Sequence, residues 1–158
     1  GLLKPNEGQI YIDGNKCDFD NPYWKQVISY IPQTTYLLND SIKNNIIFGE
    51  DYDTEKFKKA IKDSQLLSFI DSLPNKEDTV IGEDGSLISV GEKQRIGIAR
   101  ALYLERQLLI CDEITSALDI KTTENIIDCL KAISKEKTII FISHNQEVIS
   151  AATKKVSL

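Results

Sequence analysis

The sequence predicts an α/β fold with a parallel sheet and a helical segment inserted into it. Two continuous apolar runs, residues 108–113 and 138–142, are typical of buried parallel strands. Residues 120–134 between them are predicted to form a helix, and residues 41–73 form a longer block of helical material. Strands that alternate with helices in this way indicate a parallel sheet.

Composition limits what the chain can be. Its 158 residues, 41% of them hydrophobic, suffice for one domain with an apolar core, and no apolar run approaches the roughly 18 residues of a membrane span. A net charge of −5 and a pI near 5.0 argue against nucleic acid as a partner. Cys17, Cys111 and Cys129 form no CxxC pair and are odd in number. We therefore expect neither a disulfide framework nor a zinc site, and a reducing compartment.

The N-terminal part of the chain predicts a hairpin, a helical turn and a strand. Residues 9–13 alternate apolar and polar side chains before a glycine, as in a strand that leads into a hairpin. A short helical turn is expected around Trp24, followed by a strand over residues 27–31. Pro32 ends this strand because proline has no N–H to donate to a sheet. Gln33 therefore lies on the loop just beyond a strand end.

The block over residues 41–73 is predicted to be helical. Its apolar side chains recur at helical spacing, and the lysines between them indicate a solvated face. Pro74 and Asn75 end the block. Residues 78–86, which contain two glycines, are predicted to form a loop.

Residues with chemical potential follow this loop. A helix is expected to begin at Ser89, which can cap its first turn, and Gly91 lies in that turn, where free N–H groups and the helix dipole favour an anion. The strand over residues 108–113 ends on two adjacent carboxylates. Ligands bind at the carboxyl ends of strands in open α/β sheets. Asp112 is therefore suited to holding Mg²⁺ or its waters, and Glu113 to orienting or deprotonating a water.

Three motifs in this region occur in a recognisable order: ISVGE at the start of the helix, the strand ending in Asp112 and Glu113, and a TSALD turn that ends at Asp119. In this order they resemble the nucleotide-binding domain of ATP-binding cassette (ABC) proteins. In that family the signature is usually LSGGQ, the strand is the Walker B motif and SALD is the D-loop. The resemblance implies a P-loop NTPase (RecA-like) core with a parallel sheet and an inserted helical subdomain.

The resemblance also implies a role in ATP hydrolysis for seven residues. Gln33 would begin the Q-loop and, with Asp112, would bind Mg²⁺. Glu113 would be the general base or water-polarising carboxylate. His144, two residues beyond the strand over 138–142, would be the H-loop histidine that contacts the γ-phosphate. The remaining cofactor-binding residues implied are Ser89 and Gly91 of the signature, which would act on ATP held by an opposite domain, and Asp119 of the D-loop.

The family's domain plan divides the chain into three parts. Residues 1–39 would be a remnant of the β-subdomain and the core strand up to the Q-loop, and residues 40–106 the helical subdomain with the signature helix. Residues 107–158 would be the core with the Walker B motif, D-loop and H-loop. The sequence begins at a glycine and contains neither a Met nor a GxxxxGK[ST] phosphate loop. We therefore expect a fragment that starts after the Walker A motif, lacks the N-terminal strands and hydrolyses ATP poorly by itself.

Two further segments resemble exporters within the family. Thr79, Gly82, Glu83 and Gly85 fit a TxVGExG-like segment ahead of the signature, and NIIFG, ending at Gly49, is similar to an exporter sequence. The resemblance implies ATP and Mg²⁺ as cofactors, with a second ABC domain and a transmembrane domain as partners at the cytoplasmic face of the inner or plasma membrane. ATP-driven head-to-tail dimerisation would power substrate export or the flipping of lipid-linked substrates. The alternatives are a non-transport ABC ATPase of DNA repair or translation, or an inactive truncated remnant.

The signature departs from the family pattern at two positions. Val90 stands where the first glycine is expected, and its β-branched side chain hinders close approach of a phosphate and disfavours a positive φ. Glu92 stands where glutamine is usual, and its carboxylate suits the helix dipole but would repel a polyphosphate. We hypothesise that this signature makes a weakened contact with the opposite ATP.

Overall fold

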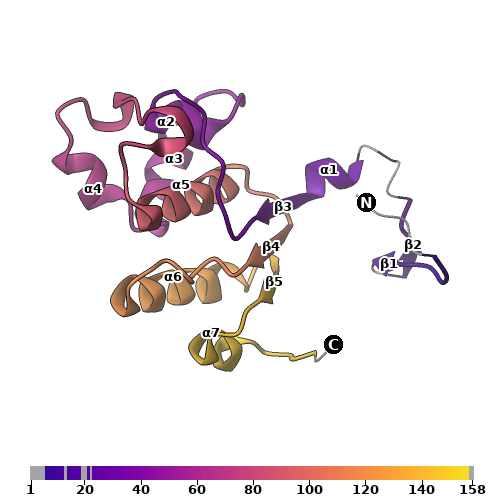
Figure 1. Ribbon diagram of the computed structural model, residues 1–158. Helices are drawn as coiled ribbons and strands as arrows, with labels where there is room; N and C mark the ends of the chain where they lie inside the picture. Colours follow the sequence, from indigo (N-terminus) through magenta and orange to yellow (C-terminus); the bar gives the residue numbers. More distant parts are fainter. Residues whose placement is uncertain (1–5, 13, 19–20, 22, 157–158) are drawn as a thin grey trace.

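A three-stranded parallel sheet is the central feature of the computed structural model, which describes residues 6–12, 14–18, 21 and 23–156 (Figure 1). Its strands are β3 (Ile28–Ile31), β4 (Leu108–Asp112) and β5 (Thr138–Ile142), in the order β3-β4-β5. Both pairings are parallel. The predicted α/β class with a parallel sheet is confirmed, although β4 ends one residue earlier than expected, at Asp112.

A small hairpin and a short helix precede the sheet. Strands β1 (Tyr11–Ile12) and β2 (Asn15–Lys16) pair in antiparallel fashion, as expected, while Asp13 of the predicted strand lies outside the described residues. Helix α1 (Tyr23–Val27) is the predicted helical turn, and it runs directly into β3. In Figure 1 the hairpin lies beyond α1, on the side away from the other helices.

The predicted helical block contains α2 (Ile42–Ile47), α3 (Thr54–Asp63) and α4 (Leu67–Ser72). Side-chain caps begin two of these helices: Ser41 accepts a hydrogen bond from a backbone N–H of α2, and Asp53 accepts two from α3. The lysines of α3 are exposed, as predicted. The stretch after Pro74 is less irregular than expected, because it forms two short 3₁₀ turns, η1 (Lys76–Asp78) and η2 (Glu83–Gly85).

Helix α5 (Val90–Tyr103) packs on both the other helices and the sheet. Ile96 and Ala99 belong to an apolar cluster with α2, α3 and α4. Ile98 and Ala101 belong to a second cluster with the strands and with α6 (Ile120–Ile133). Because α5 buries two faces, most of its side chains from Gln94 onward are inaccessible to solvent.

One face of the sheet is covered and the other is exposed. Helices α5 and α6 pack on the first face, and α7 (Gln146–Ala151) follows β5 (Figure 1). On the second face Tyr30, Ile140 and Ile142 keep 55%, 46% and 51% of their surface exposed. Fully parallel sheets are normally covered on both faces, so this apolar face is unusual for a self-contained domain.

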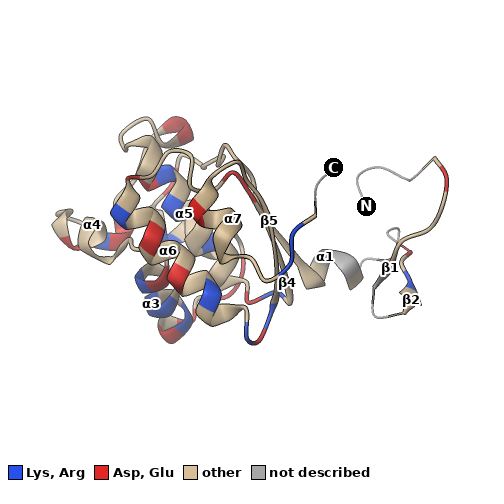
Figure 2. Cartoon of the chain, turned by 90° about the horizontal axis from the view of Figure 1, so that it is seen from below, with Lys and Arg blue, Asp and Glu red and all other residues tan. Residues whose placement is uncertain are grey.

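The remaining composition-based expectations concern charge, thiols and membrane spans. Acidic and basic side chains intermingle over α3 and α6 (Figure 2), in line with a solvated surface. All three cysteines are free, and burial raises the pKa of Cys111 to about 12 and that of Cys129 to about 11. Across the described part of the chain, no helix has both the length and the apolar character needed to span a bilayer.

Candidate active site

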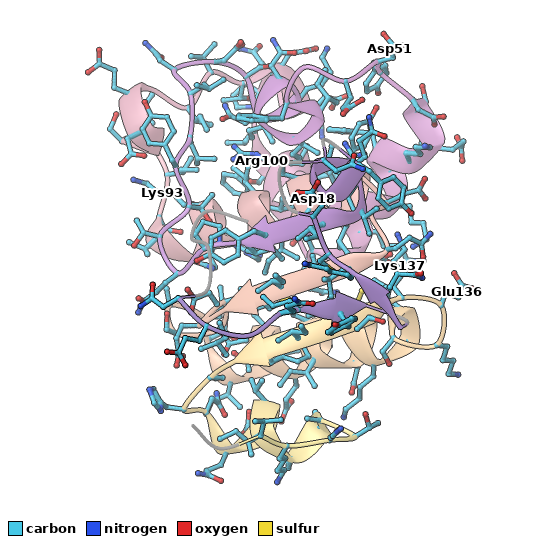
Figure 3. The ribbon with its side chains drawn as sticks, turned by 90° about the vertical axis from the view of Figure 1, so that its right-hand side faces the viewer. Asp18, Asp51, Lys93, Arg100, Glu136 and Lys137 are labelled. Atoms are coloured by element: carbon cyan, nitrogen blue, oxygen red, sulfur yellow. The ribbon has the colours of Figure 1, made fainter. Side chains whose placement is uncertain are left out.

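The predicted site residues Gln33, Asp112, Glu113 and His144 follow three neighbouring strand ends. Gln33 comes two residues after β3, Asp112 is the last residue of β4, and His144 comes two residues after β5. Figure 3 shows the three strands with their arrowheads on the side where Lys93 lies, and Glu136 and Lys137 at the opposite end. The parallel register thus brings side chains that are far apart in sequence to one edge of the sheet.

Glu113 turns the chain sharply at the end of β4. Its φ of 49° lies in the left-handed region, which is unfavourable for a residue with a Cβ. Its backbone N–H donates to the Ile142 carbonyl at 2.9 Å, so β5 holds this conformation in place. The strained backbone conformation therefore occurs at Glu113, the residue that the sequence predicts to activate water.

The Glu113 side chain bonds to the segment that follows β5. Its Oε1 accepts a hydrogen bond from the His144 backbone N–H at 2.9 Å, and its Oε2 accepts one from the Ser143 hydroxyl at 3.5 Å. The His144 Nε2 lies 3.9 Å from the same Oε1, and the imidazole is fully exposed while the Glu113 side chain is 18% exposed. The carboxylate is held from one side and the imidazole is free to meet a ligand.

Asp112 bonds in the other direction, to β3. The Tyr30 hydroxyl donates to Asp112 Oδ2 at 2.8 Å. This contact arises from the register, because Tyr30 pairs with Ile110 and Asp112 is two residues further along the same face. The hydrogen bond to Asp112 raises the pKa of Tyr30 above its ordinary value, with burial and the negative charge of Asp112 adding to it.

The oxygen donors at this edge fit a hard divalent cation such as Mg²⁺. Asp112 offers a carboxylate, and Gln33, exposed on the next loop, offers an amide oxygen. No cluster of three or more His, Cys, Asp or Glu side chains forms a metal cage within the described residues. Mg²⁺ commonly binds with one or two protein carboxylates and completes its shell with phosphates and waters. The donor set therefore suits a Mg²⁺ ion that keeps other ligands besides the protein's.

The signature turn at the start of α5 has its polar groups paired internally. The Ser89 hydroxyl accepts from the Glu92 backbone N–H at 3.3 Å, and the Glu92 carboxylate accepts from the Ser89 backbone N–H at 2.7 Å. This reciprocal pair is a capping box. Val90 is helical and 65% exposed, so the turn in this structure requires no positive φ at that position.

Asp119 and Gly91 lie in a second contact region. Asp119 caps α6 by accepting from the backbone N–H of Thr122 at 2.9 Å and from its hydroxyl at 2.6 Å. These bonds from Thr122 lower the pKa of Asp119, with smaller help from Arg95. A Cβ on Gly91 would lie 3.3 Å from the Ala117 carbonyl oxygen, so the signature turn packs against the TSALD turn.

Two residues of this site were not singled out by the sequence. Tyr30 was treated only as part of a strand, and Ser143 only as part of the strand end before His144. A signal for Tyr30 exists in retrospect: a side chain with a polar tip lies three residues before Gln33, on the strand predicted over residues 27–31. Its alignment with Asp112 depends on the strand register, which a single sequence does not specify.

Comparison with known proteins gives consistent matches. The family model described as "ABC transporter" matches residues 1–116. The ATP-dependent lipid A-core flippase of Desulfotalea psychrophila is 40% identical over 152 residues, which are 95% of this chain and 27% of the relative. The ATP-dependent lipid A-core flippase of Mannheimia succiniciproducens is 38% identical over 150 residues, 93% of this chain and 26% of the relative.

A solved structure shows the same fold. A bacterial Atm1-family ABC exporter with ATP bound superposes with a TM-score of 0.88 at 35% sequence identity, covering 94% of this chain and 27% of that chain. The chain therefore spans about a quarter of the length of the proteins it matches. The predicted α/β fold, as a part of the P-loop NTPase fold, is confirmed by this likeness.

Proposed function

Because this chain belongs to the ABC transporter family, we propose that it is the greater part of a nucleotide-binding domain that hydrolyses ATP to power export or the flipping of a lipid-linked substrate. The three-part division at residues 1–39, 40–106 and 107–158 belongs to this proposal. So does a position at the cytoplasmic face of a membrane, with a transmembrane domain and a second ABC domain as partners.

The contact between Glu113 and the segment after β5 is the observation that carries the proposal. Hydrogen bonds from the His144 backbone and the Ser143 hydroxyl fix the carboxylate at the sheet edge. A fixed carboxylate can orient an attacking water and accept its proton. The exposed His144 imidazole, beside that carboxylate, is available to a γ-phosphate. Together these residues would supply positioning and proton acceptance, which phosphoryl transfer requires.

Asp112 and Gln33 are proposed to hold Mg²⁺. When bound there, Mg²⁺ would neutralise charge on the nucleotide phosphates. Tyr30 orients the Asp112 carboxylate through its 2.8 Å hydrogen bond. Among the described residues, no side chain or backbone N–H donates to Asp112 Oδ1, so this oxygen is available to a ligand.

Ser89 and Gly91 are proposed to contact ATP held by a second ABC domain. The start of α5 provides backbone N–H groups and the positive end of a helix dipole. Asp119, in the turn that packs against Gly91, would lie at the same interface. ATP binding would favour the closed pair of domains, and hydrolysis would release it.

An exposed apolar patch around α2 supports a transmembrane partner. The patch consists of Tyr36, Leu38, Phe48 and Val80, which are 67%, 42%, 49% and 53% exposed. Backbone and side-chain contacts tie it to α5, since Arg100 binds the Tyr36 carbonyl and stacks on Phe48. Exposed apolar side chains in one region of the surface are candidates for an interaction site. The substrate is proposed to be a lipid-linked amphiphile because the relatives at 38% and 40% identity are named as lipid A-core flippases.

The test is Mg²⁺-dependent ATP hydrolysis by the intact transporter that carries this chain. Replacing Glu113 by Gln keeps an oxygen to accept the His144 N–H but removes the proton acceptor, so turnover is expected to fall by about 100-fold or more. ATP binding and thermal unfolding should change little. Turnover that is unaffected by Glu113→Gln would contradict the proposed mechanism. ATP-driven movement of a fluorescent lipid between leaflets of proteoliposomes would then separate a flippase from a non-transport ATPase.

A further inference from the structure

We propose that Gln94, Gly97 and Arg100, three residues one turn apart on α5, are positioning residues that hold the loop after β3 and thereby set the location of Gln33. The inference rests on the proposed function in one respect, namely that Gln33 binds Mg²⁺. It adds that α5, the helix that begins with the signature turn, also holds the loop that carries Gln33. A shift of α5 would therefore move both the signature turn and Gln33.

The first contact comes from Gln94. Its side chain is 2% exposed, and its Nε2 donates to the Pro32 carbonyl at 3.4 Å. Pro32 immediately precedes Gln33, so this bond acts on the backbone next to the proposed ligand. A buried amide donor that reaches a loop carbonyl restrains the loop because breaking the bond leaves a buried polar group unpaired.

The second contact depends on the absence of a side chain at Gly97. A Cβ at this position would lie 2.4 Å from Thr35 Oγ1 and 2.8 Å from Thr35 Cγ2, distances that side-chain carbons do not adopt. Thr35 is 4% exposed, and its hydroxyl has no hydrogen-bond partner among the described residues. The loop therefore rests directly on the backbone of α5, and Thr35 contributes shape rather than hydrogen bonding.

The third contact comes from Arg100. Its Nε donates to the Asn45 carbonyl at 2.8 Å, and both terminal nitrogens donate to the Tyr36 carbonyl at 3.2 Å. The guanidinium lies 4.3 Å from the centre of the Phe48 ring. Figure 3 shows Arg100 in the helical half of the molecule. Arg100 forms no ion pair within the described part of the chain. Its guanidinium instead donates hydrogen bonds to backbone carbonyls of the loop and of α2.

Two backbone amides report on the loop independently of ATP. The Leu37 N–H donates to Asp84 Oδ1 at 3.4 Å, and the Leu38 N–H donates to Asn45 Oδ1 at 2.8 Å. Both lie directly after Thr35 and Tyr36. If α5 holds the loop, a displacement caused at Gly97 will weaken these bonds and speed the hydrogen exchange of both amides.

The experiment combines Gly97→Ala with Thr35→Ala in the intact transporter. Gly97→Ala alone is expected to raise the Mg²⁺ concentration for half-maximal ATPase by about tenfold, a typical effect of disturbing groups behind a metal ligand. It should also speed exchange at Leu37 and Leu38. Adding Thr35→Ala removes Thr35 Oγ1 and Cγ2, the two atoms closest to the new Cβ. The Mg²⁺ dependence and the exchange rates should then return towards the wild-type values. Glu124→Ala, on the exposed face of α6, is the matched alanine control.

Each outcome decides between positioning and a merely structural role. An alanine in place of a helix glycine without a steric conflict would only raise the melting temperature. Unchanged Mg²⁺ dependence and exchange in Gly97→Ala would therefore overturn the proposal, as would a double variant no better than the single one. If the wild type has no ATPase activity that depends on Glu113, the proposed function fails. The hydrogen-exchange rates of Leu37 and Leu38 still test whether α5 holds the loop.

Discussion

The sheet edge and the signature turn are assembled in opposite ways. At the sheet edge, Asp112 bonds to β3 and Glu113 to the segment after β5, so each carboxylate is held by a residue 30 or more positions away in sequence. In the signature turn, the Ser89 and Glu92 side chains each accept the other residue's backbone N–H, and the two residues are three positions apart. One region is organised by strand register and the other by local helix chemistry.

This difference indicates how each region responds to a ligand. At the sheet edge, the His144 imidazole is exposed, and both carboxylates are held by hydrogen bonds from other segments of the chain. At the signature, the Glu92 carboxylate already accepts from the Ser89 backbone N–H. A phosphate that sought this donor would have to displace a carboxylate. The proposed weakness of the signature thus has a local cause in the capping box.

The largest effect is expected at the sheet edge. Asp112→Asn should lower Mg²⁺-dependent turnover of the intact protein by about 100-fold, at the upper end of the losses seen when metal sites are perturbed. The same change weakens the hydrogen bond from Tyr30, the main cause of its raised pKa, and removes the Asp112 charge, so that pKa should fall towards its ordinary value in a tyrosine NMR titration. An unchanged Tyr30 titration would show that the two side chains do not interact in solution.

The sign of the pH effect follows from the same hydrogen bond. The folded state raises the pKa of Tyr30, so the contact stabilises the fold at pH values below the ordinary tyrosine pKa. That contribution is lost as the pH rises through the raised value. In Asp112→Asn the alkaline loss of stability should be smaller than in the wild type, which thermal unfolding at increasing pH would measure.

A smaller effect is expected when the local cap is removed. Ser89→Ala deletes the hydroxyl that accepts a hydrogen bond from the Glu92 backbone N–H, and it should lower the free energy of unfolding by about 1 kcal/mol. Urea denaturation of the chain would measure it. The matched control is Ser68→Ala on the exposed side of α4. An equal loss in both variants would mean that the capping box does not stabilise α5.

The smallest effect is expected on relieving the signature. We would combine Val90→Gly with Glu92→Gln. The glutamine can still accept the Ser89 backbone N–H in the capping box, but it carries no negative charge. Repulsion between two unit charges about 4 Å apart in water is worth about 1 kcal/mol, so relieving it should raise ATPase of the intact protein by up to about fivefold. Unchanged turnover would contradict the idea that this signature makes a weakened contact with the opposite ATP.

Local sequence patterns were sufficient to predict most elements. The run over residues 138–142 matches β5, and Ser89 caps α5 as expected. Local rules also implied that Gln33, Asp112, Glu113 and His144 would follow strand ends, because parallel strands share one carboxyl edge. Patterns were less informative about residues 74–86, where turn types depend on contacts with neighbouring segments.

The partners of each site residue were decided by the tertiary structure. The bond between Tyr30 and Asp112 depends on strand register, and the left-handed conformation of Glu113 is held by the Ile142 carbonyl. The contact of Gly97 with Thr35 depends on how closely the loop approaches α5.

The sequence by itself determined the elements, the motif order and the chemistry of the side chains at the strand ends. It did so because helix caps, apolar periodicity and strand ends are properties of neighbouring residues. Only the tertiary structure decided which of these side chains touch. Such contacts join residues that are distant in the chain, and their geometry depends on register and close packing.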